Sequence, residues 1–130
     1  MGEAHCNGNK TAVNAWCKQQ KLPIVVAGAA GGQIDPTQIR IADLAQTVQD
    51  PLLSKVRASL RREHGFPRQG KMGVSCVYST EALRYPDKNA SCDTRGGPAG
   101  LNCAGFGSSA CVTSVFGLAA ASHAIKLITG

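Results

Sequence analysis

Six cysteines are the side chains of this 130-residue sequence best suited to covalent chemistry: Cys6, Cys17, Cys76, Cys92, Cys103 and Cys111. None of them forms a C-x-x-C pair, so we expect no structural zinc site and no metal ligands. The first ten residues lack the apolar stretch of a signal peptide, which favours reduced thiols in a cytoplasmic protein. Cys103 is the candidate catalytic thiol, because it precedes an apolar helix whose dipole would favour the thiolate; a buried, inert thiol is the alternative. We expect Cys17, Cys76 and Cys111 to lie in the core.

Positive charge is concentrated in one segment of the chain. The sequence has 14 basic and 8 acidic residues and a formal net charge of +6. Six cations lie on one predicted helix and the segment after it, opposed only by Glu63: Lys55, Arg57, Arg61, Arg62, Arg68 and Lys71. Cations on the outer face of a helix can follow a phosphate backbone, which makes these six a candidate nucleic-acid surface. A solvated helix face is the alternative.

A glycine-rich stretch, GAAGG at residues 28–32, follows a predicted strand. It lacks the phosphate-loop pattern G-x-x-x-x-G-K-[ST] and leads into Asp35 and Pro36 instead of a helix, so a tight turn is the expected structure. Ligands of open α/β sheets bind at the carboxyl ends of strands. Gly28, Gly31 and Gly32 are therefore candidates for close approach of a substrate to the backbone.

The spacing of apolar and turn-forming residues predicts an α/β fold, with helices over residues 9–21, 50–64 and 108–128 and strands over residues 24–29, 37–44 and 74–79. Ala12, Val13 and Trp16 share an apolar face of the first helix. The continuous apolar run at 24–29 is typical of a central strand covered on both faces. Because such a strand needs parallel neighbours, the chain resembles a Rossmann-type sheet cut in the middle. We expect residues 1–130 to form a single, partial domain with a mobile loop over residues 85–102.

The stretch from Cys103 to Ile125 contains no Asp, Glu, Lys or Arg. Its length is sufficient for a membrane span, but its many small and hydroxyl side chains and its lack of flanking aromatic and basic clusters argue against one. We expect a buried helix and no membrane contact. Small residues at Ser114, Gly117 and Ala121 would allow close helix packing in a core or a dimer interface.

Three blocks of the sequence resemble the tRNA threonylcarbamoyladenosine dehydratases of the ubiquitin-activating-enzyme-like superfamily. They are residues 28–55 (GAAGGQIDPTQIRIADLAQTVQDPLLSK), 71–81 and 102–117. The sequences G-x-x-G-G-Q-I-D-P and D-P-L are specific, since generic Rossmann proteins do not carry them. The resemblance covers nearly the whole chain from about Lys10.

This resemblance implies the carboxy-terminal half of a Rossmann-like activating-enzyme fold, with a mixed sheet and flanking helices. It also implies a cytoplasmic homodimer that uses ATP and magnesium to activate the carboxylate of threonylcarbamoyladenosine next to the anticodon of tRNA. Attack within the modified base then closes a ring with loss of water. A monovalent cation is left open as a further ligand. The six cations above would then contact tRNA.

The resemblance also shows what this sequence lacks. Lys10 matches a family Lys or Arg that follows an aspartate of the nucleotide site, but His5 stands in place of that aspartate. Cys103 matches a cysteine of related activating enzymes and would form a thioester or shape the pocket. The family's G-x-G-G-V-G loop is not in the sequence, so we expect these residues to bind no cofactor tightly and to be inactive alone. Two alternatives remain: an activating enzyme for a small sulfur-carrier protein, with that carrier or a sulfurtransferase as partner, or a non-catalytic RNA-binding or dimerisation module.

Overall fold

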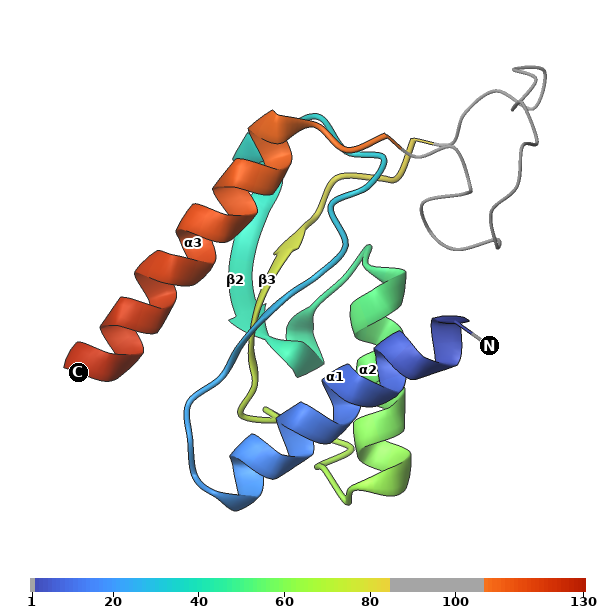
Figure 1. The fold of residues 1–130 in the computed structure, drawn as a ribbon, viewed down its shortest axis with the longest axis vertical. Coiled ribbons are helices and arrows are strands. Elements are labelled where there is room, and N and C mark those ends of the chain that lie inside the picture. Colours follow the sequence, from blue (N-terminus) through green and yellow to red (C-terminus); the bar gives the residue numbers. More distant parts are fainter. Residues whose placement is uncertain (1, 85–106) are drawn as a thin grey trace.

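Helices cover both faces of a small mixed sheet in this protein (Figure 1). The structure is a computed structural model that describes residues 2–84 and 107–130, with side chains described from residue 8 onward. The strands β1 (Val25–Ala27), β2 (Ile39–Asp43) and β3 (Ser75–Ser79) have the order β1-β3-β2. Strand β1 runs parallel to β3, and β2 runs antiparallel to it. The predicted α/β class with a mixed sheet is confirmed. The loop predicted over residues 85–102 lies outside the described residues.

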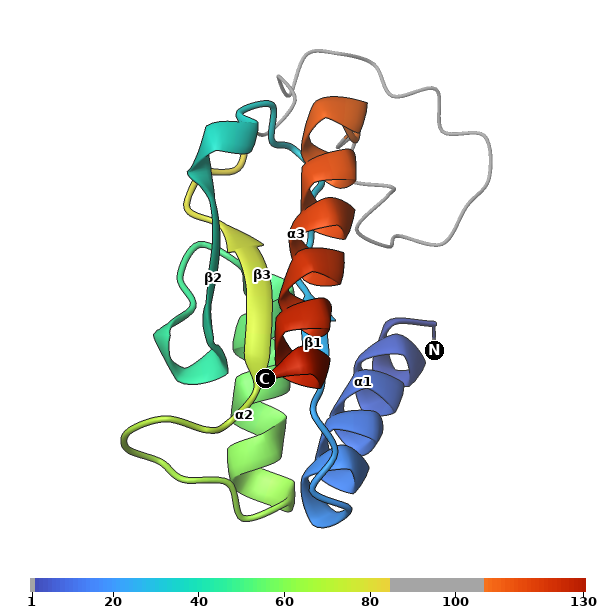
Figure 2. The same cartoon turned by 90° about the vertical axis from the view of Figure 1, so that its left-hand side faces the viewer.

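The α-helices of the described residues form the two outer layers, as Figure 2 shows. Helices α1 (Gly2–Gln19) and α2 (Pro51–Glu63) lie on one face of the sheet, and α3 (Ala110–Thr129) lies on the other. Short 3₁₀ turns, η1 (Pro36–Gln38) and η2 (Leu44–Gln46), flank β2. Side chains alternate along β3, so Cys76 and Tyr78 join the core cluster with α1 and α2, whereas Val77 packs with residues of α3. Each helical layer is thus held by its own set of β3 side chains.

Helix α2 begins and ends where the sequence predicts. The Asp50 carboxylate caps its amino terminus by accepting a hydrogen bond from the N–H of Leu53 at 3.0 Å, and Pro51 occupies the first turn. The helix ends at Glu63, and Gly65 follows with a φ of +66°, a conformation that glycine adopts without strain. Both boundaries depend on residues that are adjacent in sequence, which is why they could be predicted.

The amino-terminal region differs from the sequence prediction in two elements. The run predicted as a central strand is β1, which has three residues and lies at the edge of the described sheet, where a Rossmann-type sheet was predicted to be cut; β3 is the central strand of the described sheet. An apolar run predicts burial but not position in the sheet. Helix α1 buries Thr11, Asn14 and Ala15, while its apolar face with Val13 and Trp16 is turned to solvent. Small side chains on the buried face let α1 approach its neighbours closely.

Helix α3 is present as predicted, but the prediction that it is buried is wrong. Ser109 caps it, and only Val112 and Phe116 are buried, because the sheet covers one side of the helix. Leu118, Ile125 and Ile128 are 71%, 60% and 78% exposed. By length and composition α3 could cross a membrane: its most apolar 18-residue stretch has a mean hydropathy of 1.5, and 11% of that stretch is buried. A single helix of this kind is weak support for a membrane span.

Candidate functional site

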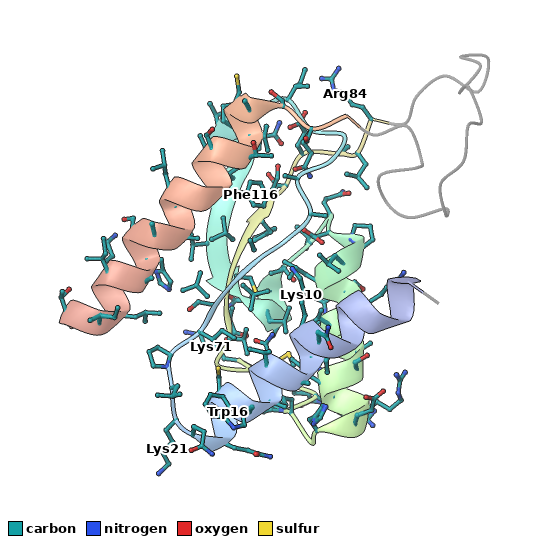
Figure 3. All side chains as sticks on the ribbon, viewed as in Figure 1. Lys10, Trp16, Lys21, Lys71, Arg84 and Phe116 are labelled. Atoms are coloured by element: carbon teal, nitrogen blue, oxygen red, sulfur yellow. The ribbon has the colours of Figure 1, made fainter. Side chains whose placement is uncertain are left out.

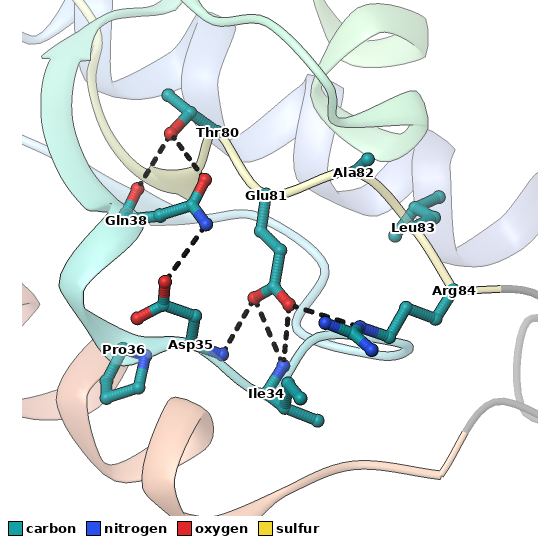
Figure 4. A pocket seen from close by; sticks show the side chains of 9 residues that line it. All are labelled: Ile34, Asp35, Pro36, Gln38, Thr80, Glu81, Ala82, Leu83 and Arg84. Carbon is teal, nitrogen blue, oxygen red and sulfur yellow. Dashed lines mark hydrogen bonds and ion pairs between the residues drawn. The ribbon is translucent and has the colours of Figure 1, made fainter.

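The segments that follow β1 and β3 meet at one end of the sheet, beside the start of α2 (Figure 1). This is the carboxyl end of the parallel pair, where open α/β sheets bind ligands. Cavities of about 880, 370 and 330 Å³ open there between described residues. The largest is lined by residues 34–36, 38 and 80–84 (Figure 4).

Glu81 joins the two segments that line the largest cavity (Figure 4). Its buried carboxylate accepts hydrogen bonds from the N–H of Ile34 at 3.1 Å and from the N–H of Asp35 at 2.8 Å. The Arg84 side chain lies 3.7 Å from this carboxylate and is 67% exposed, so donors of its guanidinium are accessible to an anionic ligand. No pattern in the sequence predicted a role for Glu81 or Arg84. The available signal was a carboxylate and an arginine just after a buried strand.

Asp35 orders the opposite wall of the same cavity. Its carboxylate accepts hydrogen bonds from the Thr37 hydroxyl at 2.6 Å, the Thr37 N–H at 2.9 Å and the Gln38 amide at 3.0 Å. The hydroxyl of Thr37 and then the amide of Gln38 lower the pKa of Asp35, so it is ionised at neutral pH. Because these hydrogen bonds hold the 3₁₀ turn η1 in place, the role of Asp35 is to shape the wall of the cavity.

Lys10 and Gly28, both predicted from sequence, come together at the end of β1. The Lys10 ammonium donates a hydrogen bond to the Ala27 carbonyl at 3.2 Å. Asp50 accepts a second hydrogen bond from the N–H of Ala29 at 2.9 Å, and burial raises the pKa of its carboxyl despite its backbone hydrogen bonds. A Cβ at position 28 would overlap the Asp50 carboxylate, so only glycine fits there. The end of β1 therefore carries the Lys10 cation, and no side chain at position 28 blocks a ligand from approaching the backbone.

The turn after β1 presents a buried amide to the same region. Gly32 has a φ of +74° and its N–H donates to the Gly107 carbonyl at 3.1 Å, which fixes the turn predicted at Gly31 and Gly32. Gln33, which follows, is only 2% exposed, and its Oε1 has no hydrogen-bond partner within the described part of the chain. Buried acceptors normally have a partner, so this oxygen has capacity for a donor. Gln33 also lines the cavity of about 330 Å³.

The six cations of the predicted nucleic-acid surface differ in how far the fold engages them. The Arg57 guanidinium is half-buried and donates to the carbonyls of Leu44 and Thr47 at 3.0 Å, so it holds η2 against α2. Arg61 donates to the Pro67 carbonyl, and Arg62 pairs with Glu63 on the surface. The other three, Lys55, Arg68 and Lys71, are exposed, and Figure 3 shows Lys71 on the same side of the molecule as Trp16 and Lys21.

The described thiols are not arranged for catalysis. Cys76 is buried in the core as predicted, and burial raises the pKa of its thiol to about 12, which disfavours the reactive thiolate. Cys17 is half-buried and Cys111 is exposed, so the prediction of a core position is wrong for Cys111, which lies on the open side of α3. Cys92 and the candidate nucleophile Cys103 lie outside the described residues. No group of three or more metal-ligating side chains occurs among residues with described side chains.

Comparison with known proteins agrees with the resemblance seen in the sequence, although no family model matches the chain. The tRNA threonylcarbamoyladenosine dehydratase of Escherichia coli (strain K12) is 48% identical over 124 residues, which are 90% of this chain and 46% of the relative. The chain is a homologue of the tRNA threonylcarbamoyladenosine dehydratases. The dehydratase of Haemophilus influenzae is 44% identical over 119 residues, or 89% of this chain and 44% of the relative.

Solved structures of the E. coli dehydratase have the same fold. Its complex with AMP superposes with a TM-score of 0.74 at 45% identity, covering 92% of this chain and 44% of the solved one. The complex of the same dehydratase with ATP gives a TM-score of 0.74 at 45% identity, over 92% and 43% of the two chains. The chain therefore spans a little under half the length of the dehydratases that it matches.

Proposed function

We propose that this chain is the substrate-side half of an ATP-dependent tRNA threonylcarbamoyladenosine dehydratase, which works in the cytoplasm as a homodimer on tRNA. The supporting observation is its identity of 44–48% with named dehydratases over nine-tenths of its length. The open cavities at the carboxyl ends of β1 and β3 offer a place for the modified base.

The glycine-rich stretch after β1 does not fit the triphosphate of ATP. The Gly28–Gly32 stretch leads into η1 and not into the amino terminus of an α-helix, so it offers no helix dipole to phosphates. We assign ATP, magnesium and any monovalent cation to the part of the dehydratases that this chain does not cover. There ATP turns a carboxylate oxygen into a leaving group, which lets a nucleophile of the same base close a ring with net loss of water.

The chain's own contribution is to hold the modified base beside that carboxylate. The Lys10 ammonium can pair with an anion at the end of β1, and the Gln33 Oε1 can accept a hydrogen bond from a donor of the substrate. Cys103 remains a candidate nucleophile or pocket residue. Of the predicted tRNA-contacting cations, Lys55, Arg68 and Lys71 are the ones free to meet phosphates, since Arg57 is engaged within the fold.

A chimera tests this function. In it, this chain replaces the matched stretch of the E. coli dehydratase, and the product on tRNA carrying threonylcarbamoyladenosine is measured by mass spectrometry of nucleosides. We expect the cyclic base from the chimera, and neither product nor ATP–pyrophosphate exchange from the 130-residue chain alone. A soluble chimera that binds ATP but leaves the base unchanged contradicts the proposal. Exchange that depends on a sulfur-carrier protein instead of tRNA would favour the alternative activating enzyme.

A further inference from the structure

Gln33 contributes a buried oxygen to the cavity between the glycine turn after β1 and the start of α3. This side chain is only 2% exposed, and its Oε1 has no hydrogen-bond partner among the described residues. An unpaired acceptor in a protein interior costs free energy, so an N–H group of a bound ligand would remove that cost. The cavity has a volume of about 330 Å³, which is at the lower end of the range of about 300–1,000 Å³ for small-molecule sites. Its size suits a substituent of a base better than a whole nucleotide.

The same cavity has two sources of positive potential. The N–H of Arg84 donates to the Gly32 carbonyl at 3.0 Å, which holds this arginine beside the glycine turn. Its Nε faces the Glu81 carboxylate, whereas its terminal nitrogens have no partner in the part of the chain that the structure describes. Ser108 and Ser109 line the cavity at the amino terminus of α3, where the helix dipole favours an anion. No acidic side chain is among the described residues that line it.

A ligand that satisfies this cavity needs an N–H donor and an anion within one small group. Unmodified adenosine has N–H donors but no anion, and a backbone phosphate of RNA has the anion but no N–H donor. The threonylcarbamoyl group has both, because a ureido N–H and the carboxylate of threonine lie in one short substituent. Gln33 also belongs to the G-x-x-G-G-Q-I-D-P block through which the chain resembles the dehydratases.

We propose that this cavity binds the threonylcarbamoyl group of the substrate. Its ureido N–H donates to the Gln33 Oε1, and its carboxylate faces the Arg84 guanidinium and the start of α3. The neighbouring cavity of about 880 Å³ shares Ile34 and Arg84 with this one, so there is space beside the group for the base that carries it (Figure 4). The inference rests on the proposed function and makes Gln33 and Arg84 the residues that distinguish the modified base from adenosine.

Titration of the 130-residue chain with the nucleoside threonylcarbamoyladenosine, followed by heteronuclear NMR, tests this site without ATP or tRNA. We expect the amide resonances of Gly32, Gly107 and Ser109 to shift, since these residues line the cavity. Adenosine and the methyl ester of the nucleoside's carboxylate should each bind about fivefold more weakly or worse, because neither has the anion. The nucleoside has no phosphate, so the ester separates a carboxylate site from a phosphate site.

Three variants of the chain assign the contacts. Gln33→Met removes the acceptor at similar side-chain length, and Arg84→Gln removes the charge. Arg40→Gln is the matched control, because Arg40 is an exposed arginine that lines neither cavity. We expect the first two to weaken binding of the nucleoside by about fivefold to 20-fold and the control to leave it unchanged. Because the Gln33 Oε1 is unpaired, Gln33→Met should keep or raise the Tm, whereas a purely structural amide would be missed and the Tm would fall.

Several results would overturn the inference. They are no binding of the nucleoside up to about 10 mM, equal affinities for the nucleoside and its methyl ester, and an unchanged affinity in either Gln33→Met or Arg84→Gln. The proposed function is measured separately, through the cyclic base made by the chimera. Product from the chimera without binding of the nucleoside refutes this inference alone, and binding of the nucleoside without product refutes the proposed function alone.

Discussion

Replacement of Gly28 by alanine tests the contact that shapes the candidate site. Its Cβ would overlap the Asp50 carboxylate, whose displacement breaks its hydrogen bonds with the N–H groups of both Ala29 and Leu53. Loss of a helix cap costs about 1 kcal/mol, and loss of a hydrogen bond to a charged group costs about 1.5–3 kcal/mol. We therefore expect Gly28→Ala to lower the free energy of unfolding by roughly 2–4 kcal/mol. For a chain of this size that corresponds to a fall in Tm of roughly 8–16 °C in scanning calorimetry.

Two further variants isolate the cause of this loss. Gly8→Ala is the matched control, because a Cβ there meets nothing within 4 Å and the position is helical; it should be neutral or stabilise by up to about 1 kcal/mol. In an Asp50→Ala background the overlap is gone, so Gly28→Ala should cost less than about 1 kcal/mol. An equal cost in both backgrounds would refute the reasoning.

Three other predictions follow from single side chains. Arg57→Ala should lower the free energy of unfolding, measured in urea, by about 1.5–3 kcal/mol, because its guanidinium holds η2. Arg62→Ala, on the surface, should change it by less than about 0.5 kcal/mol. Equal effects of the two substitutions would contradict this role of Arg57. Iodoacetamide at mildly alkaline pH should label Cys111 much faster than Cys76 in the native chain, as peptide mass spectrometry can check, since the Cys76 thiol has a pKa of about 12. Burial raises the pKa of Asp43, but its backbone hydrogen bonds outweigh burial, so the pKa of the folded state is lowered. The resulting stabilisation is present above the pKa of Asp43 in the unfolded chain and is lost as the pH falls through its pKa in the folded chain. Wild type should thus lose more stability than Asp43→Asn between about pH 5 and pH 2, and parallel curves would count against this.

The parts of the fold that the sequence predicted are those set by neighbouring residues. The ends of α2, the turn at Gly31 and Gly32, and strand β3 all follow from caps, glycine positions and short apolar runs. The candidate site was predicted only in part. Lys10 and Gly28 were predicted as site residues and lie at the end of β1, whereas the Glu81 carboxylate accepts from N–H groups 46 and 47 residues earlier in the chain, which no local pattern reveals.

By itself, the sequence determined the family resemblance, the α/β class and the order of helices and strands, because each depends on residue type and short-range spacing. The tertiary structure alone decided which strand is central, which apolar faces are buried and which cations are free. Arg57, for instance, has the charge of a phosphate ligand, yet carbonyls brought beside it by the packing of η2 already engage its guanidinium. Burial and pairing depend on what lies across the fold from each side chain, and that is fixed only when distant segments pack together.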